Sequence, residues 1–93
     1  MEANFELIEK EQIDTLHFPA NDVIDELDLR IQRKVELERA QALGNLEHTK
    51  IKIFFEDDAS KKIVDTTIWG VTDVEIILKK GVVIPIHRIY KIV

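Results

Sequence analysis

The chain lacks cysteine altogether, and serine, glycine and proline are scarce: it has one serine, three glycines and two prolines in 93 residues. The absence of cysteine excludes disulfides, thiolate metal sites and a cysteine nucleophile. Ser60 lies among turn-forming residues without the G-x-S-x-G frame of a hydrolase. Gly44, Gly70 and Gly81 are too far apart to cradle a phosphate in one loop. These absences predict a protein that is not an enzyme and uses no cofactor.

Long apolar runs and metal-binding spacings are missing too. No apolar stretch approaches the roughly 20 residues that a membrane-spanning helix needs. The acidic N-terminus, MEANFELIEKEQ, lacks the basic and apolar regions of a secretory signal. His17, His48 and His87 show neither His-x-His nor His-Glu-x-x-His spacing, so no metal site is predicted. We therefore expect a cytoplasmic protein that does not contact the membrane.

The composition is that of a folded protein, with 45% hydrophobic and 33% charged residues. Residues 1–93 are predicted to form a single domain. The net charge of −5 is unevenly spread. Residues 1–48 hold five Lys and Arg against twelve Asp and Glu, a balance of −7, and residues 49–93 hold eight against six, a balance of +2. An acidic first half offers no broad cationic surface for nucleic acid, but it could face the second half, within one chain or between two.

A long helix is predicted for residues 21–46, after an N-terminal segment, residues 1–20, that is either a short helix or an extended arm. Asn21 is a favoured N-cap, and Gly44-Asn45 marks the end. Counted to residue 43, the helix would be roughly 35 Å long, whereas the last 45 residues, packed alone, span only about 24 Å. The first of two apolar stripes, expected to face the core, consists of Val23, Leu27, Ile31 and Val35. The second, expected to face another subunit or the arm, consists of Leu29, Leu37, Ala40 and Leu43.

From residue 49 onward the apolar period changes to two, which is typical of strands. KIKIFFED is followed by a turn, and KKIVDTTIWGVT is a second, longer strand in which Gly70 marks a bend or bulge. Lys80-Gly81 turns the chain into VVIPI, where Pro85 belongs at an edge or strand end. We expect five short antiparallel strands over 49–93, and the class is α+β. So few residues bury a core only if the sheet bends strongly into a small barrel.

The predicted barrel interior consists of alternating apolar positions: Ile51, Ile53, Phe55, Val64, Ile68, Val74, Ile76, Leu78, Ile84 and Ile86. Phe54 and Trp69 have the opposite parity and are expected to pack beneath the first helix stripe. Exposed together, the aromatic residues could instead form a stacking platform for bases.

The pattern of residues 49–93 resembles the SH3-like and Sm-like small barrels. The resemblance lies in the charged turn after KIKIFF, the long bent second strand, IILKKG and the closing IPIHRI. The whole chain, notably LERAQALGNLEHTKIKIFFEDD, also resembles a group of short uncharacterised bacterial proteins. In the bacterial Sm-like RNA chaperones, a basic residue and a histidine near the last strand help to bind RNA. His87 falls at a similar place, Ile86 stands where the lysine would be, and Arg88 follows.

Two functions remain open at this stage. The first is a non-catalytic protein-interaction module that self-associates, most simply as a homodimer, through the second stripe of its long helix. The alternative is RNA or single-stranded nucleic-acid binding by the barrel. The residues that would carry it are Lys50, Lys52, Lys61, Lys62, His87 and Arg88. In the first function, Arg88 pairs with an acid such as Asp65 or Glu75, or with the acidic helix, and His87 bonds to backbone.

Overall fold

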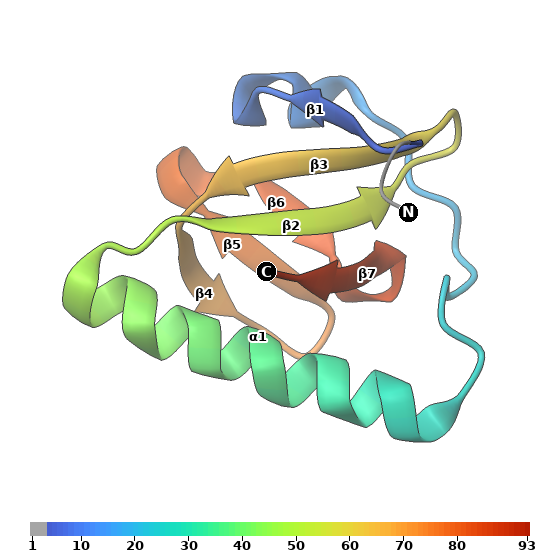
Figure 1. The fold of residues 1–93 in the computed structure, drawn as a ribbon. Coiled ribbons are helices and arrows are strands. Elements are labelled where there is room, and N and C mark those ends of the chain that lie inside the picture. The colour runs from blue at the N-terminus through green and yellow to red at the C-terminus, as the bar shows by residue number, and fades with distance from the viewer. Residues whose placement is uncertain (1–3) are drawn as a thin grey trace.

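Two β-sheets and one long α-helix make up the computed structural model, which describes residues 4–93 (Figure 1). The four-stranded sheet has the order β1 (Glu6–Ile8), β3 (Lys61–Thr66), β2 (Ile51–Glu56) and β7 (Ile89–Ile92). The three-stranded sheet has the order β4 (Ile68–Val71), β5 (Glu75–Leu78) and β6 (Val83–Pro85). The helices are α1 (Leu27–Glu47) and the short 3-10 helices η1 (Lys10–Thr15), η2 (Lys79–Gly81) and η3 (Ile86–Arg88). Neighbouring strands are antiparallel except β1, which lies parallel to β3.

The predicted α+β class is confirmed, but the prediction of a closed five-stranded barrel is wrong. The described residues form seven strands in two separate sheets. The expected long second strand breaks at Thr67, so β3 belongs to one sheet and β4 to the other. Because β1 pairs with the outer edge of β3, that edge is not available to close a barrel. Helices cover the openings instead: α1 packs along β4 and β7, and η1 packs on β3 and β6.

Local signals in the strands are confirmed. The pairing of β4 with β5 shifts register between Ile68 and Gly70, which is the predicted bulge. Gly81 has a φ of +80° in the turn before β6, and Pro85 is the last residue of that edge strand.

The helix differs from its predicted bounds at both ends. It begins at Leu27 rather than residue 21, and Asn21 is not its N-cap. The preceding segment is bent rather than helical, because Asp22 accepts a hydrogen bond from the Ile24 N–H at 2.8 Å and the Val23 N–H donates to the His87 carbonyl at 2.9 Å. At the other end the helix runs through Gly44 to Glu47, and His48 closes it in the left-handed conformation, with φ of 55°.

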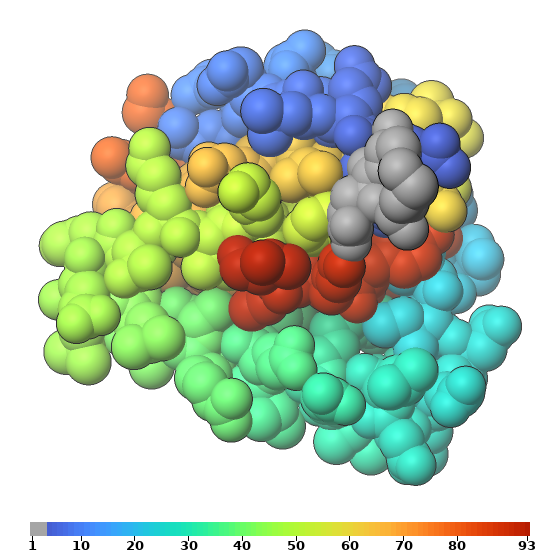
Figure 2. Space-filling model, in the orientation of Figure 1, coloured from blue at the N-terminus to red at the C-terminus, as the bar shows by residue number. Residues whose placement is uncertain are grey.

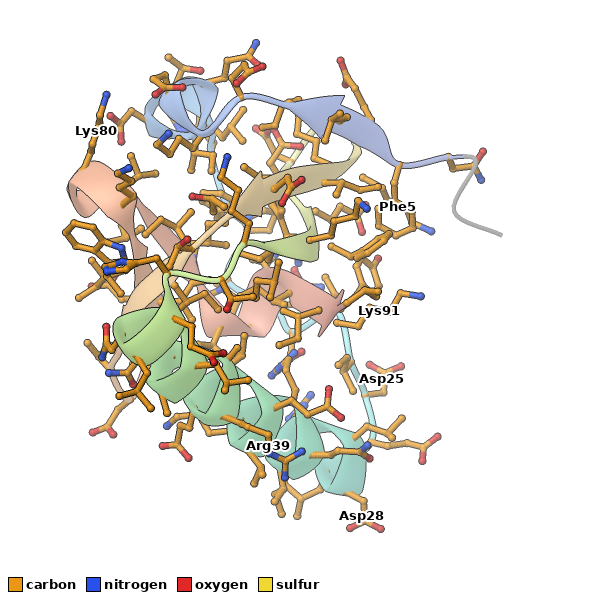
Figure 3. All side chains as sticks on the ribbon, turned by 60° about the vertical axis from the view of Figure 1, so that its left-hand side comes forward. Phe5, Asp25, Asp28, Arg39, Lys80 and Lys91 are labelled. Carbon is orange, nitrogen blue, oxygen red and sulfur yellow. The ribbon has the colours of Figure 1, made fainter. Side chains whose placement is uncertain are left out.

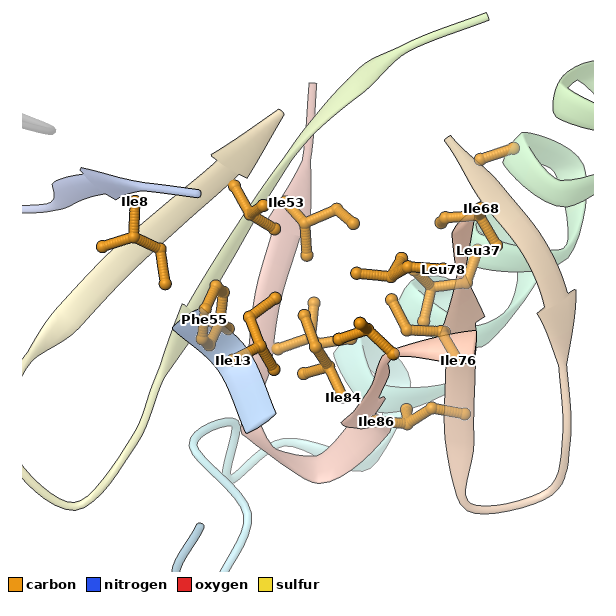
Figure 4. Close-up of a cluster of buried hydrophobic side chains, with 14 residues drawn as sticks. Ile8, Ile13, Leu37, Ile53, Phe55, Ile68, Ile76, Leu78, Ile84 and Ile86 are labelled. Atoms are coloured by element: carbon orange, nitrogen blue, oxygen red, sulfur yellow. The ribbon is translucent and has the colours of Figure 1, made fainter. Parts of the chain in front are cut away.

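The core lies between the two sheets and α1 (Figure 4). Ile53, Phe55, Val64, Ile68, Ile76, Leu78, Ile84 and Ile86 are buried as predicted. The prediction is wrong for Val74, which is 67% exposed because it lies in the β4–β5 turn that Thr72 and Glu75 close. Ile51 is only half-buried. The core also includes Ile8 and Ile13, since the N-terminal segment is both strand and helix: β1 extends the sheet, and η1 places Ile13 beside Phe55.

The prediction that Phe54 and Trp69 pack beneath the helix is wrong. Phe54 lies edge-on to Phe5, with ring centroids 5.1 Å apart, and the Lys91 ammonium sits 4.8 Å from the Phe54 ring centroid. Trp69 is 48% exposed. Figure 3 shows Phe5 and Lys91 near each other at the edge of the molecule.

Candidate functional site

The helix α1 packs on the sheets with a face that the apolar pattern did not predict. The buried positions are Arg33, Leu37, Ala40 and Gly44. Leu37 and Ala40 therefore belong to the protein's own core, and the prediction that they contact a partner is wrong. The first stripe, predicted to face inward, points outward. The exposed large apolar side chains on this outer face are Leu27, Ile31, Val35 and Leu46.

The lack of a side chain at Gly44 explains why the face of α1 that contains it packs against the sheets. A Cβ at Gly44 would lie 2.7 Å from the Ile68 carbonyl oxygen, closer than such atoms approach. The helix backbone therefore rests directly against β4. Large aliphatic side chains on the opposite face would hold the two elements further apart, so the larger residues remain outside.

Leu29 and Leu43, the remaining residues of the predicted second stripe, are each 46% exposed. Leu43 lines a mainly apolar cavity of about 240 Å³ between α1 and the strands β2 and β7, together with Ala40 and Ile92. Leu29 lines a neighbouring, more polar cavity with Tyr90 and Ile92. In the space-filling view the red surface of β7 lies between β2 and the green surface of α1 (Figure 2). This side of α1 is thus partly occupied by the protein's own strand.

Two charged side chains beside the outer face have no ion-pair partner in the part of the chain that the structure describes. Lys34 and Glu38, one helical turn apart, form no ion pair with any of residues 4–93. Lys34 borders the line of Leu27, Ile31 and Val35, and Glu38 continues it toward Leu46. An apolar line with one free cation and one free carboxylate near its middle is self-complementary if two copies run antiparallel.

Arg33 ties three segments together on the buried face of α1. Its guanidinium donates to both carboxylate oxygens of Asp22, at 2.9 and 2.8 Å, and to the Ile89 carbonyl at 2.9 Å. Burial opposes ionisation of Asp22, but the hydrogen bonds from Arg33 and from the Ile24 N–H outweigh it, so the pKa of Asp22 lies below its usual value. This pair could not be predicted from the sequence, because its partners are eleven residues apart with no regular spacing.

His87 and Arg88, the predicted nucleic-acid pair, are used within the fold. Arg88 is buried and donates to the Glu56 carbonyl at 3.0 Å and to the Asn21 carbonyl at 2.8 Å. The half-buried His87 ring places Nε2 2.8 Å from the Pro19 carbonyl oxygen. Both side chains hold the segment before α1 onto η3. His87 bonds to backbone as expected, but to that of Pro19 rather than to that of its own turn. Arg88 bonds to carbonyl oxygens and not to Asp65, Glu75 or a carboxylate of the helix.

The predicted lysines do not form one surface. Lys62 is buried, and its ammonium donates to Asp57 Oδ1 at 2.8 Å. Hydrogen bonds from Lys62 and from backbone amides outweigh the effect of burial and hold the pKa of Asp57 below its usual value. Lys61 lies 5.6 Å from the ring centroids of Phe5 and Tyr90. Of the six candidates, only Lys50 and Lys52 are exposed side chains.

Tyr90 is the only tyrosine, and its titration reports on the β2–β7 pairing. Burial, together with the hydrogen bond that its hydroxyl donates to Glu56, raises the pKa of Tyr90 to about 12. We expect the 295 nm absorbance of the folded protein to rise with a midpoint near pH 12. The ordinary value is about 10, so the neutral phenol is favoured in the fold. This contribution to stability is complete below about pH 10 and is lost as the pH rises through about 12.

The chain unfolded in guanidinium is the reference for this titration, with an expected midpoint near 10. A midpoint near 10 in the folded protein as well would show that the Tyr90–Glu56 bond does not form.

In comparisons with known proteins, no family model, curated protein or solved structure matches the chain. Among residues 4–93, no helix is long and apolar enough to cross a bilayer. Over the same residues, no group of three or more His, Asp or Glu side chains is arranged to hold a metal ion.

Proposed function

We propose that the protein is a non-catalytic interaction module that self-associates through the outer face of α1. The observation that carries this proposal is the unburied line of Leu27, Ile31, Val35 and Leu46, opposite the face that packs on the sheets. Large aliphatic side chains that continue along one face of a helix rarely stay in water without a partner. Leu46 alone is 81% exposed.

A second copy fits this face better than an unrelated partner because the charges match. A two-fold axis at the level of Glu36 would place Lys34 of each copy opposite Glu38 of the other. The same axis brings Leu27 near Leu46 at both ends of the contact. The result is an antiparallel helix pair with apolar contacts toward both ends and two symmetric ion pairs near the middle.

The length of α1 suits this role. At about 1.5 Å per residue, its 21 residues span ~32 Å, against a longest molecular extent of 33 Å. Residues 27–32 contribute no buried side chain. Stacking on a second copy would cover them without disturbing either core.

Size-exclusion chromatography with light scattering tests the proposal. The wild-type chain is expected to have twice the monomer mass at tens of micromolar. Ile31→Glu combined with Val35→Glu places four carboxylates in the seam and is expected to give monomers with unchanged far-UV circular dichroism. Both side chains are exposed, so the fold should tolerate the change.

Two further variants sharpen this experiment. Leu29→Glu combined with Leu43→Glu changes the side of α1 next to β7 and is expected to leave the dimer intact. Val74→Glu, at an exposed position in the β4–β5 turn, is the matched control. A wild-type monomer at these concentrations would contradict the proposal, and dissociation by the Leu29/Leu43 variant alone would move the contact to the other side of α1.

The alternative, nucleic-acid binding through the six residues predicted from the sequence, has less support. Lys62 and Arg88 are buried in hydrogen bonds within the fold, and His87 is held by Pro19. Lys50, in contrast, is exposed and lines a cavity together with Lys10 and Lys79.

A further inference from the structure

A cavity of about 160 Å³ brings together basic and aromatic side chains from distant parts of the sequence. Lys10 of η1, Lys50 before β2 and Lys79 of η2 line it. Thr66, Thr67 and Trp69, from the corner between the two sheets, also line it, together with His48 and Asp65. Three lysines thus line one cavity of a chain whose net charge is −5.

The positive charge of the cavity is only partly offset. Asp65 is the carboxylate that lines it, and Lys52 lies directly opposite Asp65 in the β2–β3 register. Lys10 is 3.4 Å from Glu11. A backbone hydrogen bond, followed by the hydrogen bond from Lys10, lowers the pKa of Glu11. Figure 3 shows Lys80 near η1.

Trp69 faces the cavity because of a bulge. Ile68 pairs with Leu78 and Gly70 pairs with Ile77, so Trp69 is the extra residue between them. A bulge redirects its side chain relative to the rest of the strand. The indole of the only tryptophan is thereby left 48% exposed beside the three lysines. An indole half in water offers a stacking surface for a flat ring.

The two threonines supply neutral donors. Thr66 and Thr67 are 3% and 6% exposed, yet neither hydroxyl forms a hydrogen bond within residues 4–93. The two hydroxyls still reach solvent, because among these residues Arg33 Nε is the buried side-chain polar atom that lacks a partner. At the wall of a cationic cavity, such hydroxyls can donate to an anion with several acceptor oxygens.

We propose that this cavity binds the phosphate of a nucleotide whose base stacks on Trp69. The volume of the cavity favours binding of the phosphate inside and of the base outside, because pockets that enclose a whole small ligand measure roughly 300 Å³ or more. A cavity of about 160 Å³ has room for a phosphate group but not for a nucleoside. The ammonium groups and the Thr66 and Thr67 hydroxyls would surround the phosphate oxygens. The base would lie outside, on the exposed indole. This site is separate from the outer face of α1 and does not depend on self-association.

Fluorescence of the single tryptophan tests the proposal directly. Titration of the full chain with ADP, excited at 295 nm, is expected to give saturable quenching that weakens as salt is raised. ADP is expected to bind at least about fivefold more tightly than inorganic phosphate measured by calorimetry, since stacking of one base contributes about that much or more. A single-stranded oligonucleotide forms the third arm. Tighter binding of the oligonucleotide, with the same dependence on Trp69, would identify a nucleic-acid strand as the source of the nucleotide.

Two exposed side chains can be changed without disturbing the core. Trp69→Ala, followed by calorimetry, is expected to bring ADP down to the affinity of inorganic phosphate. Lys79→Ala is expected to weaken ADP and phosphate by a similar factor, about threefold to tenfold. Arg39→Ala, with the same change of net charge at an exposed position of α1 that lines another cavity, should change neither. Absence of saturable binding at low salt, or equal affinity for ADP and phosphate in the wild type, would overturn the proposal.

Discussion

Replacing Asp22 with alanine is expected to lower the free energy of unfolding by about 3 kcal/mol, as measured by urea denaturation. The loss is large because Asp22→Ala leaves the Arg33 guanidinium buried without a counter-charge. The Nε of Arg33 is already buried without a hydrogen-bond partner, so the remaining contacts cannot compensate. Folded proteins of this size are stable by roughly 5–14 kcal/mol, which makes the expected loss a considerable part of the total.

Asp25→Ala is the matched control for this variant. Asp25 is exposed, forms no hydrogen bond or ion pair within residues 4–93, and points away from the body of the protein in Figure 3. We expect it to change stability by less than about 0.5 kcal/mol. The double variant Asp22→Ala with Arg33→Met should be less destabilised than Asp22→Ala alone, because no buried charge remains. Equal losses for the Asp22 and Asp25 variants would show that the pair contributes nothing.

The effect of pH on this pair has a definite sign. The pKa of Asp22 is depressed in the folded state, so its contribution is present above the unfolded value of about 3.9 and is lost as the pH falls through the folded value. The difference between the wild type and Asp22→Ala should therefore shrink below about pH 4.

Gly44→Ala is expected to destabilise the protein by about 2 kcal/mol, although alanine is the better helix former by about 1 kcal/mol. The new methyl group would lie 2.7 Å from the Ile68 carbonyl oxygen and 3.0 Å from Thr67 Cγ2. The oxygen belongs to the backbone of β4 and cannot turn away as a side chain would. The helix or the strand must move instead, and this loosens the contact of Leu37 with the core.

Asn45→Ala separates helix propensity from packing in this experiment. Asn45 is the next residue of α1 and is exposed, so alanine there should stabilise the protein by a few tenths of a kcal/mol. Thermal unfolding of both variants gives the comparison. If Gly44→Ala raised the melting temperature as Asn45→Ala should, the close approach of α1 to β4 would be refuted.

Local features of the fold could be predicted from the sequence because few residues determine each of them. The alternation in KIKIFF places Ile53 and Phe55 on the core side of β2, although Phe54 on the other side is buried as well. The turn at Lys80-Gly81 follows from the positive φ that glycine permits at residue 81, and Gly70 adjoins the bulge. Pro85 ends an edge strand because it has no N–H to donate.

The orientation of α1 could not be read in the same way, because partners far away in the sequence decide it. A pattern of large aliphatic residues places Leu27, Ile31 and Val35 inside, yet the close contact requires Gly44, and Arg33 turns inward only because Asp22 and Ile89 receive it. The observed helix start differs from the predicted one for the same reason. Asp22 is a residue typical of a first helical turn, but it instead accepts hydrogen bonds from Arg33.

The candidate sites were harder to predict from the sequence than the orientation of α1. Lys10, Lys50 and Lys79 come from three separate segments, and only the folded chain places them around one cavity. The signals that existed were a lone tryptophan next to a glycine in a strand and a surplus of lysine in the second half. The resemblance to SH3-like and Sm-like barrels drew attention to His87 and Arg88 instead, and it stays a prediction.

The parallel pairing of β1 with β3 has a consequence for the order in which the molecule is assembled. During synthesis Ile8 and Ile13 emerge long before Val64 and Ile84, the residues that will enclose them. Until then, the beginning of the chain has no sheet to join and no core to fill. The slow, long-range closure of that edge, rather than the rapid winding of α1, should therefore set the folding rate.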